Sequence, residues 1–455
     1  VLVAAKAKVG EPEERTGRKT GILSIQAHPN EDQAREGFAE ENRQGILPNA
    51  DNRNYKDTNH KPEIAIALND FYALNQFRPL EEIADVLENI PEFQGIMPDF
   101  RQRLNTAGQD TAQRKQLVKD LYSQIMNMPQ EEVDRMLTPL IDKLKAQNEA
   151  RQFSKDEREF WVLAAAEDFT KDGHLDIGIF SIYLLNLVHL KPEEAMYLGA
   201  GELHAYLEGA IIECMANSNN VLRGGFTDKH KDAEQLLKVL TFNSGKLDIL
   251  KPRKVSFSEA LYDTPAKEFA VSVITVTPEN PHRNSGVHSA DTFIVLKGQV
   301  EIKAKGQTLS LKKGDTFTVP AILGEYEITG NGKLYKTSVP LASKLSLQNL
   351  VSETGLKAIR DAAVKTGVFI TPTGAYRPLY PGSSGYRKVP DGQVAVFKFT
   401  LSLGTNVDEV KIEKGVRPDE AEKILVGLIK AASEASAPGR LERIEPILEA
   451  ARVGL

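Results

Sequence analysis

The stretch GELHAYLEG, residues 201–209, alternates polar and apolar side chains between two glycines. On an extended strand His204 and Tyr206 leave one face, while the neighbouring leucine and alanine side chains leave the other. A titratable face opposite an apolar face is typical of a strand in a β-barrel whose mouth holds a binding site. A core histidine with satisfied hydrogen bonds is the alternative interpretation of His204. Either way, the stretch predicts a β-rich protein.

The sequence on both sides of this stretch repeats the β character. Residues 269–276 and 291–295 are rich in β-branched and aromatic side chains, and glycines recur at short intervals from 298 to 332. Short strands with frequent glycine turns are typical of antiparallel barrels or sandwiches. The apolar run at residues 64–68 predicts a further buried strand.

A helical pattern separates these β-rich parts. From residue 78 to residue 190 apolar side chains recur at helical spacing, for example at Leu117, Leu121 and Ile125. This spacing places the three side chains on one face of a helix. We therefore predict an all-helical insertion over residues 78–190.

Residues 341–455 form a separate α+β extension in the sequence. Within it, residues 393–403 alternate apolar and polar side chains, which predicts a strand. We expect this strand to pack on the β-rich body, and the sequence assigns the extension no role.

The composition excludes several classes of protein. The chain has 455 residues, and 57 Lys plus Arg against 63 Asp plus Glu give a net charge of −6, without the basic surplus of a nucleic-acid-binding protein. No apolar run reaches the roughly 18–20 residues of a membrane span. The single cysteine, Cys214, excludes an intramolecular disulfide and a zinc site built from several cysteines. We expect a soluble, cytoplasmic protein that binds neither nucleic acid nor a membrane.

The segment SIQAHPN, residues 24–30, contains the first candidate metal ligands. Gln26 and His28 lie two positions apart, so both side chains leave the same face of a strand. An amide oxygen and an imidazole nitrogen that converge suit a borderline divalent cation such as zinc. A surface glutamine and a turn histidine are the alternative.

The segment NYKDTNHKPE, residues 54–63, ends where the loop meets the predicted strand at 64–68. Glu63 is a candidate carboxylate ligand, and Lys61 lies on the same face two residues earlier. A solvated, charged turn is the alternative interpretation.

The segment NNVLRGGFTDKH, residues 219–230, is a candidate anion site. Arg223 precedes two glycines, which let the backbone and the guanidinium approach an anion together, and Lys229 adds a second positive charge. A tight turn with a surface arginine is the alternative. His282 and His288 have no neighbouring His and Glu at metal-binding spacing, so we predict that the second β-rich part holds no metal.

Taken in order, the segments at 24–30, 54–63, 201–209 and 219–230 resemble the type I phosphomannose isomerases. The resemblance implies a mainly β fold with two cupin-type β-barrel modules, an inserted all-helical domain and an unassigned carboxy-terminal extension. The implied boundaries are 1–77 and 191–250 for the catalytic cupin module, 78–190 for the helical insertion, 251–340 for a second, metal-free cupin-like barrel, and 341–455 for the extension.

The resemblance also implies a site. Carried over position by position, it implies one zinc per chain, held by Gln26, His28, Glu63 and His204. It implies a sugar-phosphate pocket lined by Ser24, Lys61, Tyr206, Glu213, Arg223 and Lys229. The implied reaction is the interconversion of mannose 6-phosphate and fructose 6-phosphate by proton transfer through a cis-enediol, in a monomer whose partner is a small sugar phosphate.

One departure from the family pattern bears on the mechanism. Asn219 stands where members of the family usually carry Asp, and an amide cannot accept a proton as a general base. The catalytic candidates are therefore Glu213, His60 and Lys61 for proton transfer, with His60 and Lys61 ranked ahead of Glu213 because their loop adjoins Glu63, and Arg223 for the phosphate. Two other functions stay open: a non-catalytic sugar-phosphate sensor that keeps the metal, and a cupin-type isomerase that acts on glucose 6-phosphate.

Overall fold

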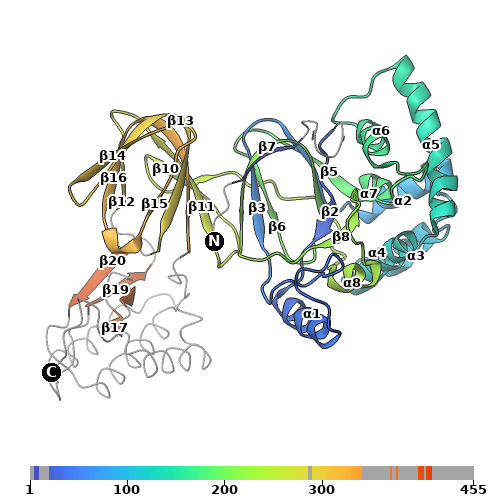
Figure 1. Cartoon of the computed structure of the whole chain (residues 1–455), viewed down its shortest axis with the longest axis horizontal. Coiled ribbons are helices and arrows are strands. Elements are labelled where there is room, and N and C mark those ends of the chain that lie inside the picture. The colour runs from blue at the N-terminus through green and yellow to red at the C-terminus, as the bar shows by residue number, and fades with distance from the viewer. Residues whose placement is uncertain are drawn as a thin grey trace. The chain divides into compact units, whose positions relative to one another are not determined.

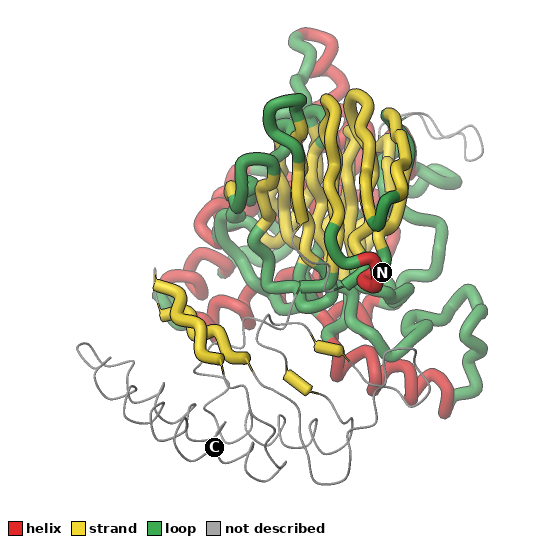
Figure 2. Tube along the Cα trace, turned by 90° about the vertical axis from the view of Figure 1, so that its left-hand side faces the viewer, coloured by secondary structure: helices red, strands yellow, loops and turns green. Residues whose placement is uncertain are grey.

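The computed structural model describes residues 20–284 and 289–340, together with the backbone of five short strands outside these ranges. Those strands are β1 (Ala5–Val9), β17 (Phe369–Ile370), β18 (Tyr376–Arg377), β19 (Lys398–Leu403) and β20 (Asn406–Lys411). Figure 1 shows the element order, and Figure 2 shows the strands in yellow and the helices in red.

An eight-stranded antiparallel sheet forms the first β-rich part. Besides β1 it contains β2 (Ile25–Ala27), β3 (Glu63–Ala67), β4 (Phe71–Phe77), β5 (Leu185–Leu190), β6 (Ala195–Leu198), β7 (His204–Met215) and β8 (Leu222–Gly225). The order along one path is β5-β4-β7-β2-β8, while β3 and β1 pair with the far half of β7. Strand β7 is thus shared by the two groups of strands that make up this β-barrel, one containing β4 and β2 and the other containing β3 and β1.

Strand β7 changes partners near Gly209. This glycine has φ +122°, and a Cβ there would lie 2.7 Å from the carbonyl oxygen of Asp70. Only glycine tolerates both this dihedral and this close approach. Before it, β7 pairs with β2 and β4, and beyond it with β1 and β3.

Alternation along β7 directs its side chains as the sequence predicts. Leu203, Ala205 and Leu207 belong to a large apolar core that includes the helices. Tyr206 faces the other way, into an apolar cluster formed by strands of the barrel. The mainly β fold is therefore confirmed, and the polar face of β7 lines the inside of the barrel.

Most of the helices lie between β4 and β5 in the chain. They are α2 (Leu80–Asn89), η1 (Pro91–Phe93), α3 (Phe100–Ala107), α4 (Thr111–Met126), α5 (Gln130–Ala150), α6 (Arg158–Phe169) and α7 (Ile179–Leu184). The stripe of Leu117, Leu121 and Ile125 is buried, as predicted. Two further helices, α1 (Glu31–Arg43) and α8 (Ala233–Val239), follow β2 and β8.

The helical pattern ends earlier than the sequence indicates. Residues 185–190, which we expect to be helical, form β5 and pair with β4. The apolar run at 179–190 is divided between α7 and β5. Periodicity alone does not distinguish a short buried strand from a buried helix, which is why the prediction is wrong here.

A second eight-stranded sheet follows. Its strands are β9 (Arg253–Lys254), β10 (Glu259–Tyr262), β11 (Ala270–Val276), β12 (His282–Asn284), β13 (Asp291–Ala304), β14 (Gln307–Lys312), β15 (Thr316–Val319) and β16 (Tyr326–Ser338), with η2 at Ala321–Leu323. An apolar cluster joins side chains of β3 and β7, such as Ile64 and Cys214, to Tyr262 and Val271 of this sheet. The outer face of β3 is therefore buried against the second barrel.

In the carboxy-terminal extension, β19 pairs with β20 and β17 with β18. Part of the strand predicted at 393–403 is thus present as β19. Its predicted packing on the β-rich body lies outside the described residues. None of the helices in the described part of the chain has the length and apolarity that a membrane crossing requires.

Candidate metal centre

His28, Glu63 and His204 converge inside the first barrel. The Nε2 atom of His28 lies 3.5 Å from Glu63 Oε1, and the Nε2 atom of His204 lies 3.5 Å from Glu63 Oε2. The side chains are at most 2% exposed. In the described ranges, this is the one group of three or more His, Cys, Asp or Glu residues whose ligand atoms lie within 4.8 Å of one another.

Three different strands bring these residues together. His28 follows the last residue of β2, Glu63 begins β3 and His204 begins β7. Because β7 pairs with both β2 and β3, residues distant in the sequence reach the same end of the barrel.

Hydrogen bonds fix the tautomers of the two histidines. Nδ1 of His28 lies 2.6 Å from the carbonyl oxygen of Asn220, and Nδ1 of His204 lies 3.0 Å from that of Glu202. Since a carbonyl only accepts, each Nδ1 carries the proton and each Nε2 is free to bind a metal. Burial lowers the pKa of His204 to about 4, which keeps this imidazole neutral at pH 7.

The atoms that face one another are unsatisfied. His28 Nε2, His204 Nε2 and Glu63 Oε2 are buried and have no hydrogen-bond partner among the residues that the structure describes. Buried polar atoms without a partner are costly and rare. Two imidazole nitrogens and a carboxylate oxygen are the donor set of catalytic zinc sites, so these residues fit zinc.

Lys61 forms an ion pair with the Glu63 carboxylate. Its Nζ atom lies 2.9 Å from Glu63 Oε1. Burial alone would raise the pKa of Glu63, but the neighbouring groups, the Lys61 ammonium among them, hold this pKa below its usual range. Glu63 is therefore ionised, as a ligand must be.

Strand register places further predicted residues on the same face. Gln26 lies opposite His204 on one side and opposite Arg223 of β8 on the other. Directly opposed residues share a face of the sheet. Gln26 and Ser24, two positions earlier, are half-buried. The register thus brings Gln26 and Arg223 to the side of the sheet that carries His204.

Tyr206 and Glu213 form a second polar pair inside the barrel. The Tyr206 hydroxyl donates a hydrogen bond of 2.8 Å to Glu213 Oε1. Burial and the nearby Glu63 carboxylate raise the pKa of Glu213, and burial raises that of Tyr206. Glu213 lies opposite Ala65, two residues along β3 from Glu63.

The structure does not bring every predicted residue to this cluster. His60 Nε2 lies 2.7 Å from Oε1 of Glu268, which precedes β11. Lys229 lies in the exposed turn after β8, where its backbone N–H donates to Thr227 Oγ1. Arg223, in contrast, lies on the side of the sheet that carries His204. Its side chain is half-buried, and burial lowers its pKa.

Two residues that contact the histidines could not be identified from the sequence. Asn220 and Glu202 supply the carbonyls that orient His28 and His204. Glu202 is itself held by hydrogen bonds from Thr241 and Asn243. Both residues lie within the quoted segments, but nothing in their spacing marks them as partners of a histidine.

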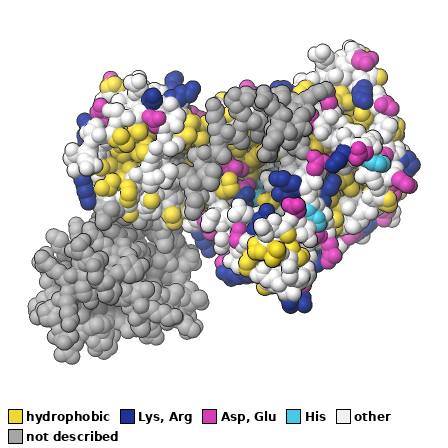
Figure 3. All heavy atoms as spheres, in the orientation of Figure 1, with side chains coloured by type: hydrophobic (Ala, Val, Ile, Leu, Met, Phe, Trp, Pro, Cys, Tyr) yellow, Lys and Arg dark blue, Asp and Glu magenta, His cyan; other side chains and the backbone are white. Residues whose placement is uncertain are grey.

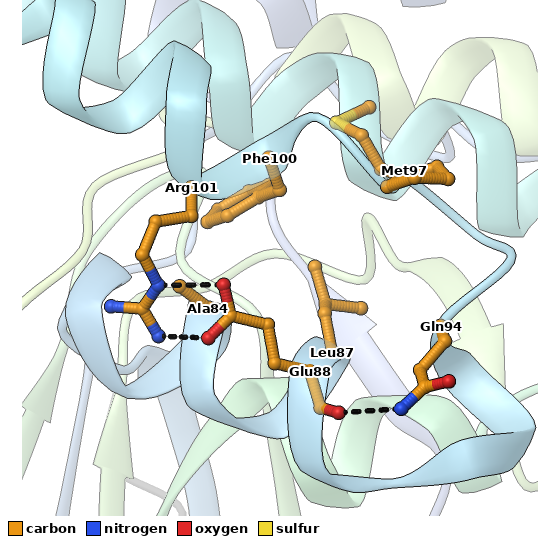
Figure 4. A pocket seen from close by; sticks show the side chains of 8 residues that line it. Ala84, Leu87, Glu88, Gln94, Met97, Phe100 and Arg101 are labelled. Carbon is orange, nitrogen blue, oxygen red and sulfur yellow. Dashed lines mark hydrogen bonds and ion pairs between the residues drawn. The ribbon is translucent and has the colours of Figure 1, made fainter.

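Two hollows lie on the helical insertion, apart from these residues. One, of about 190 Å³, is lined by Leu87, Met97 and Phe100, and the Glu88–Arg101 ion pair closes its edge (Figure 4). The other, of about 620 Å³, is lined by residues of α5 and α6 and the loop that follows. Neither is lined by any of the predicted site residues. On the face in Figure 3, basic and acidic side chains are interspersed over the described parts.

Comparisons with known proteins identify the relatives of this chain. The family model for the catalytic domain of type I phosphomannose isomerase matches residues 19–80, and that for the cupin domain of mannose-6-phosphate isomerase matches residues 261–339. Mannose-6-phosphate isomerase 2 of Arabidopsis thaliana is 33% identical over 326 residues, 70% of this chain and 70% of that protein. The Salmonella typhimurium mannose-6-phosphate isomerase is 35% identical over 316 residues, which cover 69% of this chain and 74% of that protein.

A solved structure is similar over the same part of the chain. The crystal structure of mannose 6-phosphate isomerase from Salmonella typhimurium, bound to substrate and to a zinc atom, has a TM-score of 0.59 and 33% identity. The match covers 71% of this chain and 77% of that one. Together with the two family models and the relatives above, this similarity shows that the chain belongs to the type I phosphomannose isomerase family, the mannose-6-phosphate isomerases.

Proposed function

We propose that this protein is a zinc-dependent isomerase that interconverts mannose 6-phosphate and fructose 6-phosphate. The observation that carries the proposal is the set of buried, unpaired atoms of His28, Glu63 and His204, in a family with a solved member that holds zinc and substrate. The expected fourth ligand is Gln26 of β2, which lies directly opposite His204 of β7.

The reaction moves one proton between two carbons. A base removes the proton from C2 of the aldose, and the electron pair left behind forms the C1–C2 double bond of a cis-enediol as the carbonyl oxygen gains a proton. Return of a proton to C1 and loss of the proton on O2 give the ketose. Zinc, when bound, supplies a Lewis acid that polarises substrate oxygens.

The chain's own residues supply the rest of the chemistry. We assign the base to Glu213, because its carboxylate lies inside the barrel, opposite Ala65 and two residues along β3 from Glu63, where burial raises its pKa. Tyr206 holds this carboxylate by its hydroxyl. Lys61 is the candidate acid for the carbonyl oxygen, and Arg223 the candidate for the phosphate, since a guanidinium binds it through two parallel hydrogen bonds.

His60 is a weaker candidate for proton transfer than Glu213 or Lys61. Its ring is hydrogen-bonded to Glu268, whereas Lys61 contacts a proposed ligand directly. Lys229 is exposed, which makes it a weaker candidate for the phosphate than the half-buried Arg223.

A second candidate function is a sugar-phosphate sensor that keeps the metal but does not turn over its ligand. Asn219 favours it, because an amide replaces the carboxylate that is usual in the family. Asn219 is exposed, and its backbone N–H donates to Asp57 Oδ2.

Isotope exchange during turnover tests the proposed reaction. In D₂O, proton transfer through an enediol introduces solvent deuterium at C1 of the ketose or C2 of the aldose, which NMR detects. Complete absence of solvent deuterium from both sugars, even after prolonged equilibration, would favour a direct hydride shift between C1 and C2 over the enediol. Binding of mannose 6-phosphate without any turnover, in protein shown to contain zinc, would support the sensor instead.

A further inference from the structure

The side-chain amide of Asn220 is buried, and both its oxygen and its nitrogen form hydrogen bonds to one loop. Its Oδ1 atom accepts hydrogen bonds from the backbone N–H groups of Lys56 (2.7 Å) and Asp57 (3.1 Å). Its Nδ2 group donates to the backbone carbonyls of Asp57 and Asn59, both at 2.9 Å. The side chain is fully buried, and the 56–59 loop is thus held on the segment before β8.

Asp57, which lies in this loop, in turn accepts hydrogen bonds from the segment that contains Asn220. Its Oδ1 atom accepts from the Ser218 hydroxyl at 2.9 Å, and its Oδ2 atom accepts from the backbone N–H of Asn219 at 2.7 Å. The two segments, more than 150 residues apart in the chain, are therefore joined in both directions by side chain-to-backbone bonds.

The same residue also orients a histidine. The backbone carbonyl of Asn220 accepts the hydrogen bond of His28 Nδ1, at 2.6 Å. The loop that its side chain holds leads within a few residues to Lys61 and Glu63. One residue therefore contacts both sides of the cluster: His28 through its main chain and the Glu63 loop through its side chain.

We propose that Asn220 is a positioning residue that couples the orientation of His28 to the position of Glu63. This inference rests on the proposed metal site, since it assigns Asn220 a role in the geometry of that site. The carbonyl keeps its direction towards His28 only while the side chain anchors the segment.

The chemistry of an amide explains why asparagine stands here. An amide offers two donors and two acceptor lone pairs, and all four are used by the backbone of the 56–59 loop. Asp has the same shape but lacks the donors, so two carbonyls would face a carboxylate. Ala removes a hydrogen-bond partner from four backbone groups of the loop, of which the Asn59 carbonyl keeps the Ser218 hydroxyl.

Metal binding is the direct test. Wild-type, Asn220→Ala and Asn220→Asp proteins would be stripped of metal and titrated with Co²⁺, whose visible absorption reports ligand geometry, and then with Zn²⁺ in competition with a chelator. We expect both variants to bind Zn²⁺ about 10- to 100-fold more weakly, the range typical of a disturbed hydrogen bond to a ligating histidine, because the carbonyl that orients His28 is retained but displaced. We also expect a changed Co²⁺ spectrum. If Asn220→Ala does not fold, Asn220→Asp, which keeps the side-chain volume, carries the test.

Asn186→Ala is the matched control. The Asn186 amide in β5 also donates to several backbone carbonyls, among them those of Phe77 and Gly245, and has no bond to either histidine. This variant should melt at a lower temperature than wild type but keep the Zn²⁺ affinity and the Co²⁺ spectrum.

The outcomes separate this inference from the proposed function. Wild-type affinity and spectrum in both Asn220 variants would overturn the coupling, as would an equal loss in Asn186→Ala. Wild-type protein that takes up no metal would overturn the proposed function, and the coupling with it.

Discussion

Lys61 Nζ lies 2.9 Å from Glu63 Oε1, and the two side chains are only 12% and 2% exposed. A buried ammonium is costly unless it is paired, and this one is paired with a carboxylate that also faces two histidines. The arrangement holds a positive charge beside the proposed metal ligands, where a substrate oxygen that gains negative charge would be stabilised.

Replacing this lysine should impair turnover without removing the metal. For Lys61→Met we expect kcat to fall by about 10²-fold or more, the range typical of a lost acid–base group. Zinc content, measured on the same preparation, should stay at one per chain. Lys251→Met is the control, because Lys251 forms an exposed ion pair with Glu194. Unchanged kcat in Lys61→Met would remove Lys61 from the mechanism.

Removing one histidine should remove the metal. In His204→Ala two of the three clustered donors remain, and the loss of a ligand lowers both affinity and geometric fit. Elemental analysis after dialysis should find little zinc in this variant. His174→Ala serves as the control, since His174 bonds to Asp134 on the helical insertion. Stoichiometric zinc in His204→Ala would refute the assignment of ligands.

The arginine of β8 should act on the phosphate and not on the metal. For Arg223→Ala we expect kcat/KM for mannose 6-phosphate to fall by about 10²-fold or more, on the scale of a lost charged hydrogen bond to a buried anion. Arg223→Lys should recover only part of it, because an ammonium does not reproduce the guanidinium fork. Zinc content should be normal in both variants. Near-normal kcat/KM in Arg223→Ala would place the phosphate elsewhere.

Arg283→Ala is the control for charge alone. Arg283 pairs with Glu327 on the second sheet and is largely exposed. This variant should have the kinetics of the wild type.

The single thiol should be unreactive in the folded protein. Cys214 is buried in the apolar cluster that joins β3 and β7 to the second sheet. Burial raises its pKa to about 12, so at pH 8 the thiol is protonated as well as inaccessible. A thiol-specific chromogenic reagent should label one thiol per chain after unfolding and almost none before. Rapid labelling of the native protein would show that the cluster opens readily.

Much of the fold is readable from the sequence, because it depends on local periodicity. The alternation around His204 predicts a strand with a polar inner face, and Leu203 and Ala205 are indeed buried on the opposite side. The helical stripe at 117–125 is likewise buried. The strand at 185–190 is different: its pairing with β4 overrides an apolar pattern that suits either structure.

The candidate site is readable only in part. Same-face spacing identifies Gln26 with His28, and Lys61 with Glu63, but not that the two pairs meet. That depends on the register of β7, which no local pattern specifies. His60 shows the same limit: it adjoins Lys61 in sequence, yet its ring is bonded to Glu268, more than 200 residues away.

The role of Asn220 has no sequence signal at all. Its partners are backbone groups of a loop more than 160 residues earlier, and bonds to the backbone place no demand on the identity of the residues they reach. Only the three-dimensional arrangement shows the contacts from which this role is inferred.

The central claim, a zinc-dependent sugar-phosphate isomerase, is tested most directly by one assay. Purified protein is given mannose 6-phosphate, and fructose 6-phosphate is detected through coupled enzymes, before and after removal of metal by a chelator and again after addition of Zn²⁺. The account predicts turnover that is lost with the metal and restored by Zn²⁺. Protein that contains zinc but forms no fructose 6-phosphate, or turnover that survives complete removal of metal, would contradict it.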